Sequence, residues 1–177
     1  MAFEHIWAPW RLGYIVGEEK LPEPEEPLDL LPDADPECFL CQCVADRADR
    51  ERLTVCRGQQ ALTVLNRYPY TNGHLLIAPT RHLPRLDQLS DDEHLELAQM
   101  TTRMVEALEK VLSPEGFNIG LNLGREAGAG LPGHLHWHVV PRWNGDTNFM
   151  TSLAGIRVIP QSLDALWEAL TDALAKQ

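Results

Sequence analysis

Three histidines alternate with apolar residues in the run from His134 to His138, where Leu135 and Trp137 separate them. Such strict alternation is typical of a half-buried strand, on which every second side chain points to the same face. The run therefore predicts a row of three imidazoles above a packed core. An imidazole titrates near neutral pH, and one of its nitrogens can attack while a hydrogen bond holds the other. Attack on phosphorus suits such a row, because the bond between histidine and phosphorus is labile.

The same spacing is open to a second interpretation, because alternating histidines on a strand can also chelate a catalytic metal ion. In that case His134, His136 and His138 would all be metal ligands. A separate pair, Cys38 and Cys41, has the spacing of zinc ligands. The alternative for this pair is two reduced cysteines packed in the core.

The composition indicates one globular domain that acts without nucleic acid or a membrane. The 177 residues are 44% hydrophobic, which is enough for a normal core. The net charge of −11 argues against a nucleic-acid binder, which would carry a basic face. The sequence shows no long apolar run and no signal peptide, so we expect a cytoplasmic protein with reduced cysteines.

Composition shifts divide the chain into an aromatic N-terminal segment (1–16), a linker rich in proline and acidic residues (17–37), a main domain (38–150) and a C-terminal extension with a helix (151–177). The N-terminal segment carries Trp7, Trp10 and Tyr14, so we expect it to pack on the domain or on a partner chain. The linker holds five prolines among many acids, a composition that resists regular structure.

The main domain reads as an antiparallel α+β fold. Alternating apolar residues predict strands at 61–65, 74–78 and 117–121, beside the histidine strand. Ser90 begins a capping-box pattern, and apolar residues then recur every three or four positions to about Leu112, which predicts a long helix. Ser162 begins the last helix. Strands on both sides of a helix, joined by hairpin-like turns, are typical of this fold class.

A glycine-rich loop, residues 124–133, leads directly into the histidine strand. Glycines let backbone N–H groups approach an anion closely, although most glycine-rich loops are simply turns. Next to the histidine strand, this loop favours a phosphate site. The sequence contains neither a P-loop nor a dinucleotide fingerprint.

These segments together resemble the histidine triad family, whose members are nucleotide hydrolases and transferases acting on phosphorus. The run HLHWHVV at 134–140 resembles the motif that names the family. The segments at 65–79 and 122–128 resemble its upstream strand pair and its phosphate loop, in the same order. The resemblance implies a small antiparallel sheet with a long helix and a C-terminal helix, and a homodimer whose sheets join across the interface.

The resemblance also implies catalytic roles for three histidines. His136 would be the nucleophile that takes up a nucleoside monophosphate. His138 would help to bind and polarise the phosphate. His74 matches a histidine that joins this network in relatives.

The residues implied in substrate binding lie in the other matching segments. Asn66 would bind the ribose hydroxyls, and Asn122 and Gly128 would contact the phosphates. Relatives often carry a hydroxyl side chain just before the histidine strand, whereas this chain has no hydroxyl at 130–133. We therefore expect backbone N–H groups, that of Gly130 among them, to replace this hydroxyl at the phosphate.

The resemblance also implies two further ligands for the zinc site of Cys38 and Cys41. Some relatives add a histidine after the second strand and the first histidine of the run, and here these are His82 and His134. With Cys38 and Cys41 they would hold a structural zinc, which would give His134 a structural role. Cys43 is a spare candidate ligand, and no organic cofactor is implied.

The segments 7–11 and 141–149 resemble a bacterial branch of the family that includes diadenosine tetraphosphate phosphorylases. We therefore expect nucleotidyl transfer from dinucleoside polyphosphates through a covalent intermediate of His136 and AMP, with inorganic phosphate as the acceptor. Two alternatives stay open: a hydrolase of AMP conjugates or other nucleotides, and a non-catalytic nucleotide-binding protein. The expected partners are the nucleotide, inorganic phosphate and a second copy of the chain.

Overall fold

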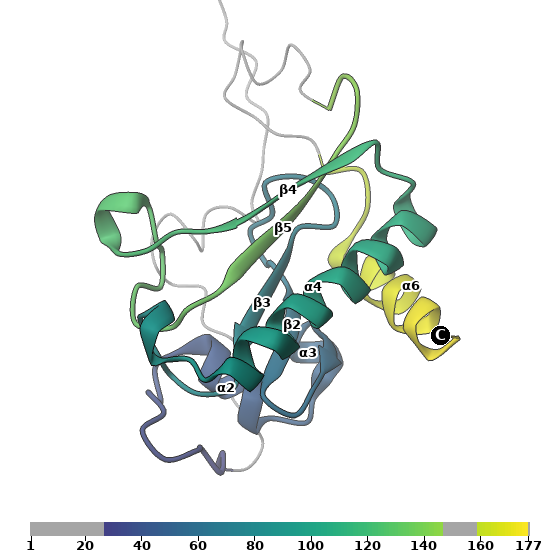
Figure 1. Cartoon of the computed structure of the whole chain (residues 1–177). Helices are drawn as coiled ribbons and strands as arrows, with labels where there is room; N and C mark the ends of the chain where they lie inside the picture. The colour runs from purple at the N-terminus through teal and green to yellow at the C-terminus, as the bar shows by residue number, and fades with distance from the viewer. Residues whose placement is uncertain (1–26, 147–158, 177) are drawn as a thin grey trace, which may run out of the picture.

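The computed structural model describes residues 27–146 and 159–176, which form an α+β domain (Figure 1). The expectations for the segment 1–16 and for residues 17–26 of the linker lie outside these residues, and residues 27–37 of the linker contain no helix or strand. One antiparallel sheet has the strand order β1-β2-β3-β5-β4. The strands are β1 (Thr54–Arg57), β2 (Ala61–Leu65), β3 (Leu75–Pro79), β4 (Gly116–Leu121) and β5 (Trp137–Arg142). The helices are α2 (Phe39–Ala45), α3 (Asp49–Arg52), α4 (Asp91–Leu112) and α6 (Leu163–Ala175), with 3-10 turns η2 (Leu86–Gln88) and η3 (Arg125–Ala127).

The two faces of the sheet bury different layers. The long helix α4 and the neighbouring α6 cover one face, where Leu75, Ile77 and Val139 are fully buried (Figure 1). On the opposite face, Leu76 and Ala78 pack with residues of α2. Successive strand residues point to opposite faces, so the central strands β2 and β3 are buried along their whole length. His138 lies opposite Leu76 in the sheet, so its side chain is on the α2 face.

Both long helices begin where the sequence predicts. The Oγ of Ser90 accepts a hydrogen bond from the Glu93 N–H at 3.3 Å, and the Glu93 carboxylate accepts one from the Ser90 N–H at 2.8 Å. This capping box satisfies two backbone donors at the start of α4. The Oγ of Ser162 likewise accepts from the Ala165 N–H at 3.2 Å and caps α6. None of the described helices is long and apolar enough to cross a membrane.

The histidine strand is shorter than predicted. Strand β5 begins at Trp137, so His134 and His136 lie just before it, and the prediction of strand over the whole run is wrong in this respect. The pairing of β3 with β5 ends at Ile77 and Trp137. Pro79 has no N–H to donate to a longer ladder, and the N–H of Leu135 instead donates to Leu83 at 2.7 Å.

A tight connection between β2 and β3, residues 66–74, carries site residues to β5. The N–H of Asn66 donates to the carbonyl of His74 at 2.9 Å and closes the connection. Gly73 has a φ of +80°, and a Cβ added there would lie 2.6 Å from a methyl of Leu112, so only glycine fits. The hydroxyl of Thr71 donates to the carbonyl of Pro141 at 2.9 Å, which fastens the connection to β5.

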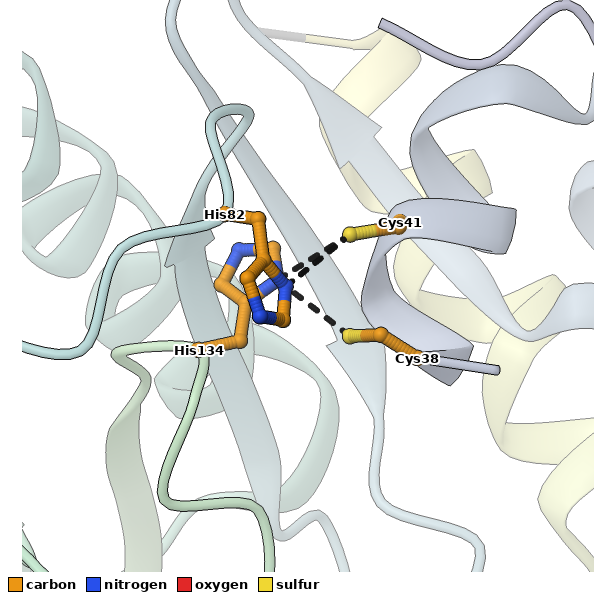
Figure 2. A group of neighbouring side chains, drawn as sticks. All are labelled: Cys38, Cys41, His82 and His134. Carbon is orange, nitrogen blue, oxygen red and sulfur yellow. Dashed lines mark hydrogen bonds between the residues drawn. The ribbon is translucent and has the colours of Figure 1, made fainter. Parts of the chain in front are cut away.

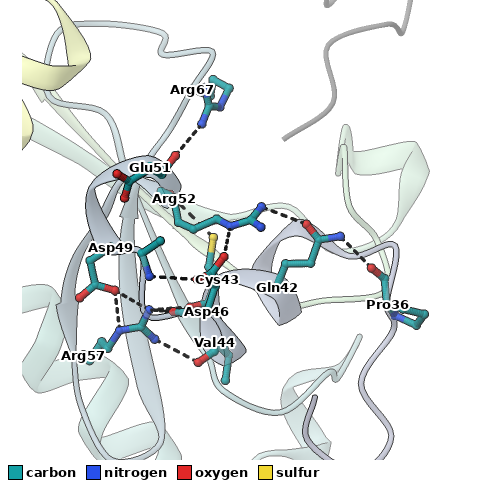
Figure 3. A network of polar contacts seen from close by, with 11 residues as sticks. Pro36, Gln42, Cys43, Val44, Asp46, Asp49, Glu51, Arg52, Arg57 and Arg67 are labelled. Carbon is teal, nitrogen blue, oxygen red and sulfur yellow. Dashed lines mark hydrogen bonds and ion pairs between the residues drawn. The ribbon is translucent and has the colours of Figure 1, made fainter. Parts of the chain in front are cut away.

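Two arginines hold the end of α2, Arg57 from β1 and Arg52 from α3 (Figure 3). The guanidinium of Arg57 donates to the carbonyls of Cys43, Val44 and Asp46 at 2.7, 3.1 and 2.5 Å, which are unpaired groups at the end of α2. Arg52 is buried and pairs with the Asp46 carboxylate at 2.8 Å. The helix that carries Cys38 and Cys41 at its start is thus fixed through its other end.

Candidate active site

His136 is held in one tautomer by the backbone. Its Nδ1 lies 2.8 Å from the carbonyl oxygen of His134. A carbonyl can only accept, so Nδ1 carries the proton and Nε2 of the neutral ring holds the lone pair. The residue is 8% exposed, and its ring lies edge-on to that of His138, with 5.1 Å between ring centroids. This arrangement offers a fixed nucleophilic nitrogen.

His138 pairs with a histidine from the β2–β3 connection. Nε2 of the fully buried His74 lies 2.9 Å from Nδ1 of His138. The Tyr70 ring stacks beside both, at centroid distances of 4.6 and 5.8 Å. Burial lowers the pKa of His138 to about 4, and repulsion from a charged His136 acts in the same direction. His138 is therefore neutral at neutral pH.

A cavity of ≈ 890 Å³ opens beside this histidine network, a size that accommodates a nucleotide. It is lined by His138, the predicted Asn122, and residues of β4, β5 and the loop after β5, including Arg142, Trp143 and Asp146. Arg142 is already paired with Asp146 at 2.5 Å. Three other predicted site residues do not line the cavity: His136, Gly128 and Gly130.

Two buried atoms at this cavity lack a hydrogen-bond partner within the described part of the chain. They are Nε2 of His138 and Oδ1 of Asn72, and both residues line the cavity. A buried polar atom without a partner is costly, so such atoms point to ligand contacts. Asn72 was not among the predicted site residues; its place inside the segment 65–79 of the family resemblance is the signal that could have found it.

The glycine-rich loop is exposed and uses some of its own N–H groups. The N–H of Gly128, whose φ is +87°, donates to the Arg125 carbonyl at 2.9 Å. The side-chain amide of Asn122 reaches the Gly128 carbonyl at 3.5 Å. Gly130 lies in open space, where an added Cβ would meet no atom within 4 Å. Phosphate contacts by these residues stay predictions.

The four predicted zinc ligands lie together (Figure 2). Nδ1 of His134 is 3.4 Å from the Cys38 sulfur and 3.5 Å from the Cys41 sulfur, and Nδ1 of His82 is 3.3 Å from the Cys41 sulfur. All four donor atoms lie within 4.8 Å of one another. A tetrahedral zinc with ordinary bond lengths requires sulfur–nitrogen separations of about 3.6 Å. The donor set therefore fits zinc.

The surroundings of these ligands agree with a metal site. Nε2 of His134 lies 2.9 Å from the Pro79 carbonyl, which places the proton there and leaves Nδ1 free to coordinate. Burial raises the pKa of Cys38 to about 12, so a thiolate at this position needs a cation beside it. The spare candidate Cys43 instead lies 3.8 Å from the Arg52 carbonyl.

The alternative of a catalytic metal held by the three histidines of the run finds no support in the geometry. Nδ1 of His134 faces the cysteines, while Nδ1 of His136 and of His138 face a carbonyl and His74. Both nitrogens of His134 are engaged, Nδ1 with the cysteines and Nε2 with the Pro79 carbonyl, so His134 does not share a metal ion with His136 and His138. His134 belongs to the cysteine cluster, His138 lines the cavity, and the ring of His136 lies beside His138 with 5.1 Å between ring centroids.

Comparison with known proteins agrees with this arrangement. The family model described as the HIT domain matches residues 48–145. The chain belongs to this family. Over 174 residues it is 40% identical to the AP-4-A phosphorylase of Mycobacterium tuberculosis, an alignment that spans 98% of this chain and 86% of that protein. The relatives whose names state an activity, such as this phosphorylase, are nucleotide-processing enzymes.

Two further relatives bear on activity and metal. Over 90 residues the chain is 34% identical to the asymmetrical bis(5'-nucleosyl)-tetraphosphatase of Schizosaccharomyces pombe. This alignment covers 51% of this chain and 49% of that protein. A crystal structure of a Zn-bound histidine triad family protein from Mycobacterium smegmatis superposes with a TM-score of 0.58 and 30% identity. That superposition covers 70% of this chain and 84% of the other.

Proposed function

We propose that this HIT protein transfers the adenylyl group of diadenosine tetraphosphate to inorganic phosphate and so yields ATP and ADP. The observation that carries nucleotidyl transfer is the bond from Nδ1 of His136 to the His134 carbonyl, because it leaves Nε2 as a fixed nucleophile. The choice of substrate and of phosphate as acceptor rests on the likeness to the AP-4-A phosphorylase, which spans nearly the whole chain.

The reaction then has two balanced steps. In the first, the lone pair of His136 Nε2 attacks the α-phosphorus, the Nε2–P bond forms, and the P–O bond to the departing ATP breaks. In the second, an oxygen of inorganic phosphate attacks the same phosphorus, the Nε2–P bond breaks, and ADP leaves. The neutral ring of His138 supports both steps by offering an N–H to a phosphoryl oxygen, where charge develops.

The role of the cysteine cluster in this proposal is structural. Cys38, Cys41, His82 and His134 would hold a zinc ion that ties α2 to the segments preceding β5 and following β3. Because the His134 carbonyl fixes His136, the same ligand set steadies the backbone at the nucleophile. No step of the reaction passes through the metal.

The test is to incubate the full chain with diadenosine tetraphosphate, with and without inorganic phosphate, beside a His136→Asn variant. Phosphate-dependent formation of ATP and ADP supports the proposal. Formation of AMP and ATP without phosphate identifies a hydrolase. Saturable nucleotide binding without turnover identifies a non-catalytic binding protein. His136→Asn should remove turnover while leaving the urea midpoint close to that of the wild type.

A further inference from the structure

The side chain of Asn66 uses both ends of its amide within the β2–β3 connection. Its Oδ1 accepts a hydrogen bond from the Tyr68 N–H at 2.9 Å. A backbone N–H can only donate, so this contact assigns the oxygen and turns the NH₂ group the other way. The NH₂ nitrogen lies 3.1 Å from Nδ1 of His74.

Two donors therefore meet at Nδ1 of His74. One is the Asn66 amide and the other is the Tyr70 N–H, which also lies at 3.1 Å. Neither N–H group can accept a hydrogen bond, so Nδ1 of the neutral His74 ring carries the lone pair and Nε2 carries the proton.

The proton on Nε2 of His74 determines the tautomer of His138. Nε2 of His74 donates to Nδ1 of His138 across 2.9 Å, in a site where His74 is fully buried. Since Nδ1 of His138 accepts, the proton of the neutral His138 ring must sit on Nε2. That nitrogen is one of the buried atoms without a partner within the described residues, on a ring that lines the cavity.

We propose that Asn66 is a positioning residue that acts through His74 to present the Nε2–H of His138 to the substrate phosphoryl group. The proposal deepens the proposed function and rests on it, since His138 meets a phosphoryl group only if a nucleotide occupies the cavity. It goes beyond the family resemblance, which assigns Asn66 to the ribose hydroxyls alone. Each end of the amide makes one contact with the protein, and the contact with His74 gives this side chain a function in the ligand-free state.

A carboxylate at position 66 distinguishes the positioning role of Asn66 from a role in binding ribose. Aspartate at position 66 accepts hydrogen bonds from ribose hydroxyls as well as asparagine does, but it cannot donate to His74. It would attract a proton to Nδ1 of His74 and oppose the existing direction. Under the proposal Asn66→Asp is therefore harmful, whereas for a ribose ligand it is tolerated.

The first measurement is ¹⁵N NMR of the histidine rings in nucleotide-free protein. We expect the wild type to show His74 and His138 both protonated on Nε2, and Asn66→Asp to shift His74 toward protonation on Nδ1. A Gln59→Ala control, on an exposed turn, should leave both rings unchanged. Wild-type protonation of His138 on Nδ1, or an unchanged His74 in Asn66→Asp, would overturn the proposal.

The second measurement compares ribose and 2′,3′-dideoxyribose forms of the dinucleotide in the wild type and in Asn66→Ala. We expect Asn66→Ala to lower kcat about tenfold with both substrates, as for one hydrogen bond lost in the transition state, with little change in KM. A variant that loses kcat/KM only on the ribose substrate would establish the ribose role instead. A wild type that turns over neither substrate would refute the proposed function, while the NMR result would still decide the tautomers.

Discussion

The ring of His138 stays neutral because burial disfavours its charged form. Its pKa falls from the usual 6.5 to about 4, and the neighbouring His136 contributes repulsion when charged. Since the unfolded chain binds a proton at higher pH than the folded chain, stability is lost as the pH falls from about 6.5 to about 4. Above that window the residue makes no pH-dependent contribution.

His138→Asn should therefore reduce the acid sensitivity of folding. Between about pH 7 and about pH 4.5, the wild type should lose about 2 kcal/mol more unfolding free energy than the variant. Urea titrations of both proteins at the two pH values measure this difference. An equal loss in both proteins would show that His138 already carries its proton before the chain unfolds.

Residue types and spacing identify the histidine run as a candidate site, but they do not give the position of each proton. The tautomer of His136 depends on a carbonyl two residues earlier. That of His138 depends on His74, 64 residues away, and through it on Asn66. Which nitrogen carries a proton is decided by the atoms that the fold brings beside the ring, and alternation alone does not specify these atoms.

At the scale of elements, the cysteine cluster joins α2 to the segments around β3 and β5. Cys41→Ala should lower the zinc content of purified protein well below that of the wild type, because it removes a ligand in contact with both histidines. Cys43→Ala is the matched control, since Cys43 lies on the same helix but contacts the Arg52 carbonyl. Metal analysis by mass spectrometry checks both. Equal zinc content in the two variants, or more loss in Cys43→Ala, would contradict the assignment.

Arg57 should matter for stability far more than an exposed arginine does. Its side chain is 20% exposed and bonds three carbonyls at the end of α2, so Arg57→Met leaves these acceptors unpaired (Figure 3). We expect a loss of about 2 kcal/mol of unfolding free energy, measured with urea. Arg85→Met is the control: Arg85 and its partner Asp87 are 68% and 67% exposed, and the loss should be below about 0.5 kcal/mol. Similar losses would refute the role of Arg57.

Elements with strong local signals were predictable and short ones were not. Helices α4 and α6 combine a serine cap with apolar periodicity over several turns, and both begin where predicted. Helices α2 and α3 span seven and four residues, too few for a periodic pattern, and β1 spans four. These short elements exist because of tertiary contacts such as those of Arg57. The early end of the β3–β5 ladder was not predictable either, because it depends on which strand lies beside Pro79.

At the scale of the whole molecule, β4 is an edge strand, and Ile119 on it is 48% exposed. An open edge with an apolar side chain favours pairing with another strand, and we expect a homodimer across β4. Ile119→Lys should weaken the dimer at least tenfold, because a two-fold interface meets the charge twice. Leu95→Lys, on the exposed side of α4 at 58% exposure, is the control and should leave the dimer intact. Sedimentation velocity over a concentration series measures both; a monomeric wild type would contradict the expectation.

The central claim, a covalent bond between His136 and AMP, is tested most directly by rapid quenching of the full chain with diadenosine tetraphosphate in the absence of phosphate. We predict an intact mass increased by one adenylyl group, mapped by peptide analysis to His136, absent from His136→Asn, and released as ADP when phosphate is added. An adduct on another residue, or phosphorolysis that continues in His136→Asn, would contradict the account.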